Sequence, residues 1–146
     1  MNQQQLAERI TDAMEGAVYS GSLTSYAAQS IESARSNYPV SNLMTYCQDS
    51  GLQLIMEDMA TEDTFHPKTV FDIHYVLDFL MRRYLVDSKM VYRKTGIHYT
   101  PPKSLNTEDL ESQDTKEGRR YSTSLSVKTL LAVCEVIHCD LKFRRR

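Results

Sequence analysis

Apolar side chains recur every three or four residues in four stretches of the chain, the spacing that places them on one face of an α-helix. The stripes are Leu6, Ile10, Ala13, Met14 and Ala17; Val40, Leu43, Met44 and Cys47; Val70, Ile73, Val76, Leu77, Leu80, Met81 and Tyr84; and Val127, Leu130, Leu131, Cys134 and Ile137. The pattern predicts four amphipathic helices, the third over Val70–Leu85 and the last within Ser126–Phe143. Two shorter segments, Leu52–Met56 and Asp140–Phe143, alternate between apolar and polar residues and fit short strands.

Two polar segments interrupt these stripes. Ala60–Pro67 ends in proline and is typical of a linker or hinge. Asn106–Ser124 is typical of a long exposed loop, with a helical turn expected at Thr107–Leu110. We therefore expect a mainly α fold of two small helical modules in tandem, residues 1–60 and residues 66–146, with a short strand as an option at the end of each.

The two predicted modules resemble each other. The run Val40–Cys47 aligns with Val127–Cys134 at a separation of 87 residues (127 − 40), and Leu54 then falls on Leu141. The leading stripes align at a smaller offset, which places Ala13 on Leu80 and the methionines that follow, Met14 and Met81, on each other. An internal duplication explains both alignments, although amphipathic helices also align this well by chance.

Charge divides along the same boundary. Residues 1–65 hold two basic and nine acidic residues, a net charge of −7 (2 − 9). Residues 66–146 hold fifteen basic and ten acidic residues, a net charge of +5 (15 − 10). A positive surplus can neutralise DNA phosphates and release their counterions, so only the second module fits a nucleic acid on this criterion. Chance variation in charge between small domains is the other explanation.

Composition favours a cytoplasmic protein. A hydrophobic content of 41% and a charged content of 25% are those of soluble globular proteins. No apolar run approaches the roughly 20 residues that span a bilayer, and the first residues lack the apolar segment of a signal peptide. The odd number of cysteines, three, favours a reducing compartment over a disulfide framework.

One stretch of the basic module has the pattern of a helix-turn-helix. Arg82 and Arg83 end the third predicted helix, and the carboxylate of Asp87 can cap the next one. Val91 is the expected buried position of that helix. Gly96 is the expected tight-turn residue, because a left-handed backbone costs glycine least.

Together with Ile97 after the turn and Leu125–Leu131 at the start of the closing helix, these residues resemble the lambda-repressor-like (XRE/Cro-type) helix-turn-helix DNA-binding family over residues 70–143. Residues 5–58 resemble a degenerate second copy, in which Leu23–Gln29 is similar to the start of helix two. The resemblance implies sequence-specific transcriptional regulation, as by a phage, mobile-element or bacterial repressor.

The resemblance also implies a homodimer that places a recognition helix in the major groove of double-stranded DNA. The residues expected to contact bases are Tyr99, Thr100, Lys103, Ser104, Asn106 and Thr107. The residues expected to contact phosphates are Arg82, Arg83, Lys89, Arg93, Lys94, Arg119 and Arg120. The tail Arg144–Arg146 is expected to add mobile contacts, although any one of these charges also fits an ordinary solvated surface group.

Three departures weaken the resemblance to the family, and the first two, together with the acidic first module, favour an alternative. Tyr92 stands where the family has a small alanine, Pro101–Pro102 are tolerated only at the start of a helix, and Asn106–Ser124 is longer than the family loop. The alternative is a protein-interaction or inhibitor protein that retains the helix-turn-helix fold without binding DNA. The acidic first module then serves assembly or binds a protein partner.

No catalytic or metal-binding motif is present in the sequence. The four histidines, His66, His74, His98 and His138, lack metal-ligand spacing, and Cys134 and Cys139 do not match a zinc finger. No P-loop, dinucleotide glycine motif or nucleophile elbow occurs. We therefore expect no enzymatic activity, no metal and no cofactor.

Overall fold

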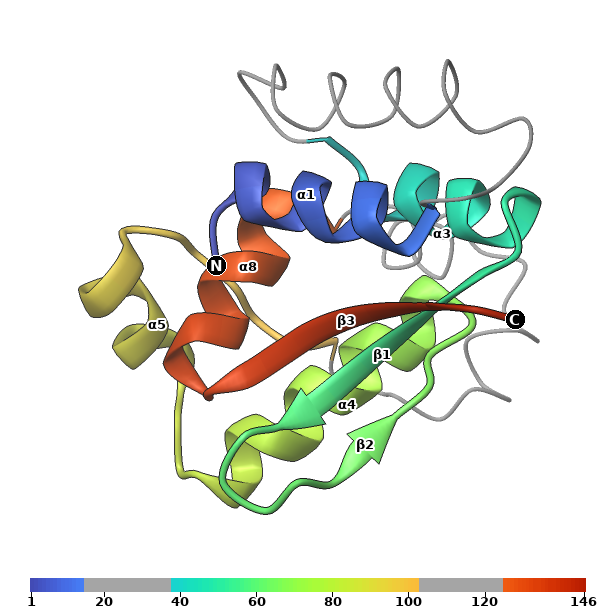
Figure 1. Ribbon diagram of the computed structural model, residues 1–146. Coiled ribbons are helices and arrows are strands. Elements are labelled where there is room, and N and C mark those ends of the chain that lie inside the picture. Colours follow the sequence, from blue (N-terminus) through green and yellow to red (C-terminus); the bar gives the residue numbers. More distant parts are fainter. Residues whose placement is uncertain (15–37, 103–124) are drawn as a thin grey trace, which may run out of the picture.

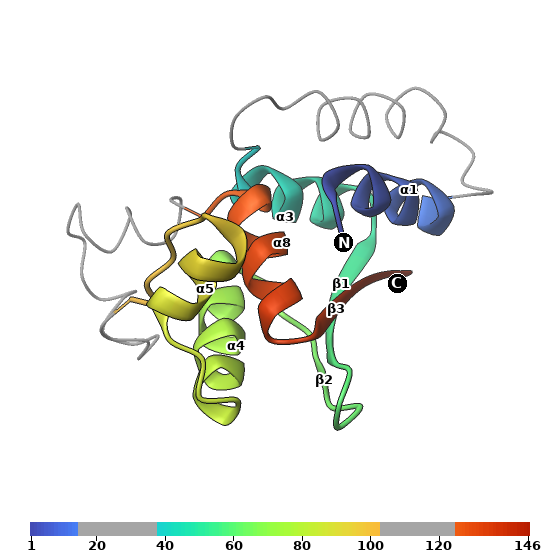
Figure 2. The same cartoon turned by 90° about the vertical axis from the view of Figure 1, so that its left-hand side faces the viewer.

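The computed structural model describes residues 1–14, 38–102 and 125–146 and contains a three-stranded antiparallel sheet (Figure 1). The strands are β1 (Leu52–Asp58), β2 (Thr64–Phe65) and β3 (Cys139–Arg145), in the order β2-β1-β3. The helices of the described ranges are α1 (Gln3–Met14), α3 (Val40–Asp49), α4 (Val70–Arg83), α5 (Ser88–Thr95) and α8 (Val127–Val136). Figure 2 shows α4, α5 and α8 on one side of the strands, with α1 and α3 above them.

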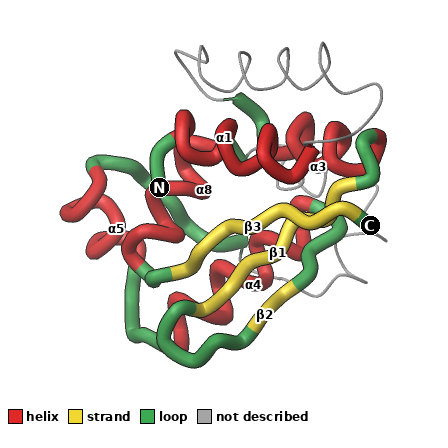
Figure 3. Tube along the Cα trace, viewed as in Figure 1, coloured by secondary structure: helices red, strands yellow, loops and turns green. Residues whose placement is uncertain are grey.

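This mixed α/β architecture contradicts the mainly α fold expected from the sequence. All four predicted helices are confirmed, and the two alternating segments are strands that pair with each other over seven positions, 52–58 against 139–145. The closing segment Ser126–Phe143 is therefore a helix followed by a strand. Figure 3 shows the resulting sheet, to which the predicted linker contributes β2, paired with β1 at Met56–Phe65 and Glu57–Thr64. Local alternation predicted two of the strands, but the sequence did not predict that they pair, because pairing between distant segments leaves no local pattern.

An internal twofold axis relates the strands of the two helix–strand units. Both α3 and β1 begin 87 residues before α8 and β3 (127 − 40 and 139 − 52). Ile55 pairs with Lys142, which is its own counterpart at this separation (142 − 55). Two residues facing each other in an antiparallel ladder are related by a local twofold axis, so the axis at this pair exchanges equivalent positions of β1 and β3.

A second pair of equivalent residues also faces each other. Pro39 forms an isolated antiparallel bridge with Ser126, again its counterpart at 87 residues (126 − 39). Two reciprocal hydrogen bonds flank the bridge: the amide of Val40 donates to the carbonyl of Leu125 at 2.9 Å, and the amide of Val127 donates to that of Tyr38 at 2.8 Å. The starts of α3 and α8 are thus joined symmetrically, as their strands are.

The leading helices α1 and α4 repeat the smaller offset. Asn2 and Gln5 exchange side-chain and backbone hydrogen bonds of 2.8 and 2.9 Å before α1. Thr69 and Asp72, which are their counterparts at this offset (69 − 2 and 72 − 5), form the same capping box before α4. Each box satisfies amides that the first turn of a helix leaves unpaired.

One hydrophobic core joins the two predicted modules. The largest fully buried side chains come from both: Leu6, Leu43, Leu52, Leu54, Met56, Ile73, Leu77, Leu80, Leu130 and Ile137. Helix α1 packs on α8 and β3, whereas α4 contacts α3, so each leading helix touches the helix–strand unit of the other half. In the part of the chain that the structure describes, no helix is long and apolar enough to cross a membrane.

A buried carboxylate fastens the end of α4 to the turn after β1. Asp58 is fully buried and accepts hydrogen bonds from Arg83 at 2.7 Å, from the hydroxyl of Tyr84 at 2.6 Å and from the amide of Ala60 at 3.0 Å. Burial raises the pKa of Asp58, but the hydrogen bonds from Tyr84, Arg83 and Ala60 outweigh it and lower this pKa to about 2. The end of α4, where the helix-turn-helix stretch begins, is therefore held in place.

Candidate nucleic-acid interface

The turn between α4 and α5 is set by local backbone chemistry. Leu85 adopts a left-handed conformation (φ 54°), and the amide of Val86 donates to the carbonyl of Met81 at 2.8 Å. This Schellman-type bond ends α4 by satisfying a carbonyl of its last turn. The chain then reverses into α5, whose orientation relative to α4 is fixed within a few residues.

Both ends of α5 match the sequence-based predictions. The Asp87 carboxylate accepts a hydrogen bond of 2.9 Å from the amide of Met90, which confirms it as the N-cap. Gly96 is left-handed (φ 74°), and its amide donates to the carbonyl of Tyr92 at 2.7 Å. Val91 is fully buried, as predicted, so α5 is anchored to the core by one apolar side chain.

Three basic residues predicted to contact phosphates project from α5. The side chains of Lys89, Arg93 and Lys94 are exposed, and no acidic side chain of the described residues forms an ion pair with them. Lys89 and Arg93 are four residues apart and therefore lie on the same side of the helix. Together the three give α5 a solvated, positively charged surface, which we call the α5 basic surface.

The basic residues at the end of α4 are already engaged. Arg82 is exposed but forms an ion pair with Asp78 at 3.0 Å. Arg83 points inward to Asp58 at 2.7 Å, also contacts Asp63 at 3.0 Å, and its guanidinium carbon lies 4.7 Å from the centre of the Phe79 ring. The structure thus gives Arg83 a structural role, while the predicted phosphate contacts Arg119 and Arg120 lie outside the described residues.

Of the residues expected to contact bases, two lie in the described part of the chain. Tyr99 is buried, its hydroxyl lies 2.7 Å from Nδ1 of His74, and the two rings stack at 5.8 Å. Burial raises the pKa of Tyr99, so it is a neutral core residue in this conformation. Thr100 is exposed, with its hydroxyl 3.4 Å from that of Ser88. The others, Lys103, Ser104, Asn106 and Thr107, lie outside the described residues.

An aromatic pair borders the α5 basic surface. Tyr92 is 48% exposed, and its ring stacks on that of His98 at 4.2 Å with the planes 18° apart. A small hollow of about 260 Å³ lies beside the pair, lined by Ser88, Lys89, Tyr92, Arg93 and His98. Tyr92 therefore covers the chain just after the turn instead of packing into the core.

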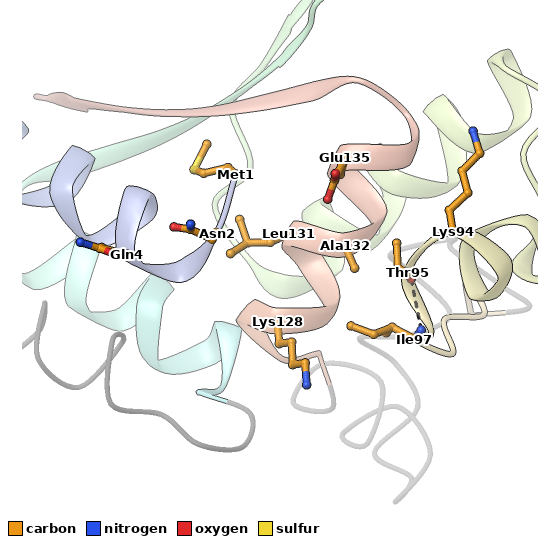
Figure 4. Close-up of a pocket in the computed structure, with 10 residues that line it drawn as sticks. All are labelled: Met1, Asn2, Gln4, Lys94, Thr95, Ile97, Lys128, Leu131, Ala132 and Glu135. Atoms are coloured by element: carbon orange, nitrogen blue, oxygen red, sulfur yellow. Dashed lines mark hydrogen bonds between the residues drawn. The ribbon is translucent and has the colours of Figure 1, made fainter.

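A larger open groove of about 690 Å³ lies between α1, α5 and α8 (Figure 4). Ile97, Leu131 and Ala132 contribute its apolar wall, and the side chains of Lys94 and Lys128 point away from each other at its rim. The sequence interpretation missed Lys128 as a surface cation. Its place in the first turn of α8, two residues after the Ser126 cap, was the available signal.

The tail Arg144–Arg146, expected to be mobile, is ordered by the sheet. Arg144 and Arg145 belong to β3, and the amide of Arg146 donates to the carbonyl of Gly51 at 2.8 Å. Figure 1 shows this end of the chain on the opposite side of the molecule from α5. The tail and the α5 basic surface therefore do not form one continuous patch.

Two of the buried cysteines have raised pKa values. Burial raises the pKa of Cys47 to about 12, and a hydrogen bond with Cys139 together with burial raises that of Cys134. Both thiols are therefore protonated at neutral pH and are weak nucleophiles. No group of three or more His, Cys, Asp or Glu side chains in the described ranges could hold a metal ion.

Comparisons of the chain with protein-family models, with curated proteins and with solved structures gave no significant match.

Proposed function

We propose that the protein is a sequence-specific DNA-binding transcriptional regulator of the cytoplasm. One observation carries the proposal: α5 combines the capped start and left-handed glycine end of a helix-turn-helix with three exposed basic side chains, Lys89, Arg93 and Lys94. In this proposal these side chains bind phosphates and fix the register of the protein on the duplex. Bases are read by the chain that follows Thr100.

The test compares two variants of equal charge. The first replaces the α5 basic surface (Lys89→Ala, Arg93→Ala, Lys94→Ala). The control replaces three exposed basic residues at the far end of the molecule (Lys68→Ala, Arg144→Ala, Arg145→Ala). Lys68 lines the same hollow as Arg146, so the control removes charge only around the end of β3.

Binding to double-stranded fragments is measured by fluorescence anisotropy between about 50 and 200 mM salt. We expect the α5 variant to bind more weakly and to reduce the slope of log K against log salt by up to about 2.7, at about 0.9 for each lost phosphate contact. The control variant should keep most of the slope. Equal losses in both variants would refute the assignment of the site, and no binding by the wild-type protein at low salt would favour the protein-interaction alternative.

A further inference from the structure

The internal twofold axis bears on the kind of DNA site that the protein can recognise. In a homodimeric regulator the twofold axis lies between two identical chains, and the paired half-sites of the DNA repeat that symmetry. Here Ile55–Lys142 places a local twofold axis inside one chain, and Pro39–Ser126 joins a second pair of equivalent positions. The equivalent segments that two chains would bring together in a dimer are therefore already paired with each other within one chain.

The sheet offers little edge for a second copy in the described residues. β3 is an edge strand, but α1 covers part of it: Arg9 donates to the carbonyl of Leu141 at 2.6 Å and pairs with Asp140 at 2.6 Å. On the opposite side β2 is two residues long and pairs only with Met56 and Glu57 of β1, so Leu52–Ile55 have no strand neighbour there among the described residues. Short or covered edges oppose strand pairing between molecules, so a second copy is disfavoured at β2 and at the covered part of β3.

The two halves share a scaffold but not its charge. The second half carries five basic residues between positions 82 and 94, three of which form the α5 basic surface. In the first half the sequence has no Lys or Arg from Ile10 to Ala34. Helix α4 follows α1 at a fixed separation in the sequence. The positions that precede α5 by the same separation all lie within this range. The two halves therefore contain similar helix–strand units, but only the second half carries the basic residues of the α5 basic surface.

We infer that a single chain acts as an internal dimer with one DNA-contacting half, and that it binds one non-palindromic DNA site as a monomer. The inference rests on the proposed function and replaces the homodimer expected from the family resemblance. The first half serves as the structural partner of the second, because α1 packs on α8 and β3. The sequence specificity for DNA then comes from a single half-site, and no symmetry-related second half-site increases the affinity.

The experiment uses the full chain and a pool of randomised duplex DNA. Repeated selection should enrich one sequence without an inverted repeat. The mass of the complex, measured by light scattering, should correspond to one 16.8 kDa chain per duplex. Adding an inverted second copy of the selected site should raise the affinity by no more than about twofold, the statistical gain, whereas two linked binding modules gain roughly 10²- to 10⁴-fold.

Different results separate the inference from the proposed function. A palindromic consensus, two chains on one site, or a gain of 100-fold or more from the inverted repeat would overturn the inference and leave DNA binding intact. A dimeric mass for the free protein would also overturn it. A selection that enriches no sequence would refute the proposed function itself, and the single-site inference with it.

Discussion

The buried carboxylate of Asp58 allows a quantitative test of how the end of α4 is held in place. Replacing it by asparagine (Asp58→Asn) keeps the shape of the side chain and removes the charge that Arg83 contacts at 2.7 Å. The pKa of Asp58 is about 2 in the folded protein, against 3.8 for an unperturbed aspartate. Linkage assigns about 2 kcal/mol of stability to the ionised form, since one pKa unit corresponds to about 1.4 kcal/mol.

The sign of the pH dependence follows from the lowered pKa. The carboxyl group of Asp58 binds a proton less readily in the folded protein than in the unfolded chain. The stability that its ionised form contributes is therefore fully present above about pH 4 and is lost as the pH falls towards 2. Urea unfolding of both proteins should therefore give a difference of about 2 kcal/mol at pH 6 that narrows below pH 4.

The exposed neighbour of Asp58 provides a matched control. Asp63 contacts the same guanidinium at 3.0 Å but its side chain is 53% exposed, so Asp63→Asn should cost less than about 1 kcal/mol. A pH-independent difference between the wild type and Asp58→Asn, or equal costs for the two variants, would refute the assignment of the low pKa to the buried contacts.

Three further substitutions test local features of the candidate site. Asp87→Ala removes the α5 cap and should cost about 1 kcal/mol in urea unfolding, whereas Asp87→Ser should restore most of it; equal losses would show that the cap is unimportant. Gly96→Ala should lower the stability by about 1–2 kcal/mol because its φ of 74° is strained for any residue with a Cβ, and an unchanged melting temperature would contradict this. Tyr99→Phe removes the hydroxyl next to buried His74 and should cost about 1 kcal/mol, with an equally stable variant as the contrary result.

The features that the sequence predicted correctly depend on short segments. The Asp87 cap and the left-handed Gly96 each follow from the identities of a few neighbouring residues, and the burial of Val91 follows from its place in the helix-turn-helix pattern. The separation of 87 residues between the helix–strand units was also visible, because the same apolar spacing occurs twice. Local chemistry determines such features whatever the rest of the chain does.

The features that it missed depend on contacts between distant segments. β2 is too short to produce an alternating pattern, and it lies in a polar stretch that resembles a linker. Arg83 looked like a surface cation because its partner, Asp58, is 25 residues away. A signal was present, however: the alternation of β1 continues to Asp58, which places an acidic residue on the buried face. A buried carboxylate requires a cation or several donors nearby.

The pairing of β1 with β3 also affects how the chain is made. β1 leaves the ribosome 87 residues before its equivalent positions in β3 (139 − 52), which at about 5–20 residues per second is a delay of roughly 4–17 s. During that interval the apolar face of β1, formed by Leu52, Leu54 and Met56, has only the two-residue strand β2 as a paired neighbour. The β3 side of β1 thus stays unpaired for seconds during synthesis, and the sheet is completed only after β3 has been made.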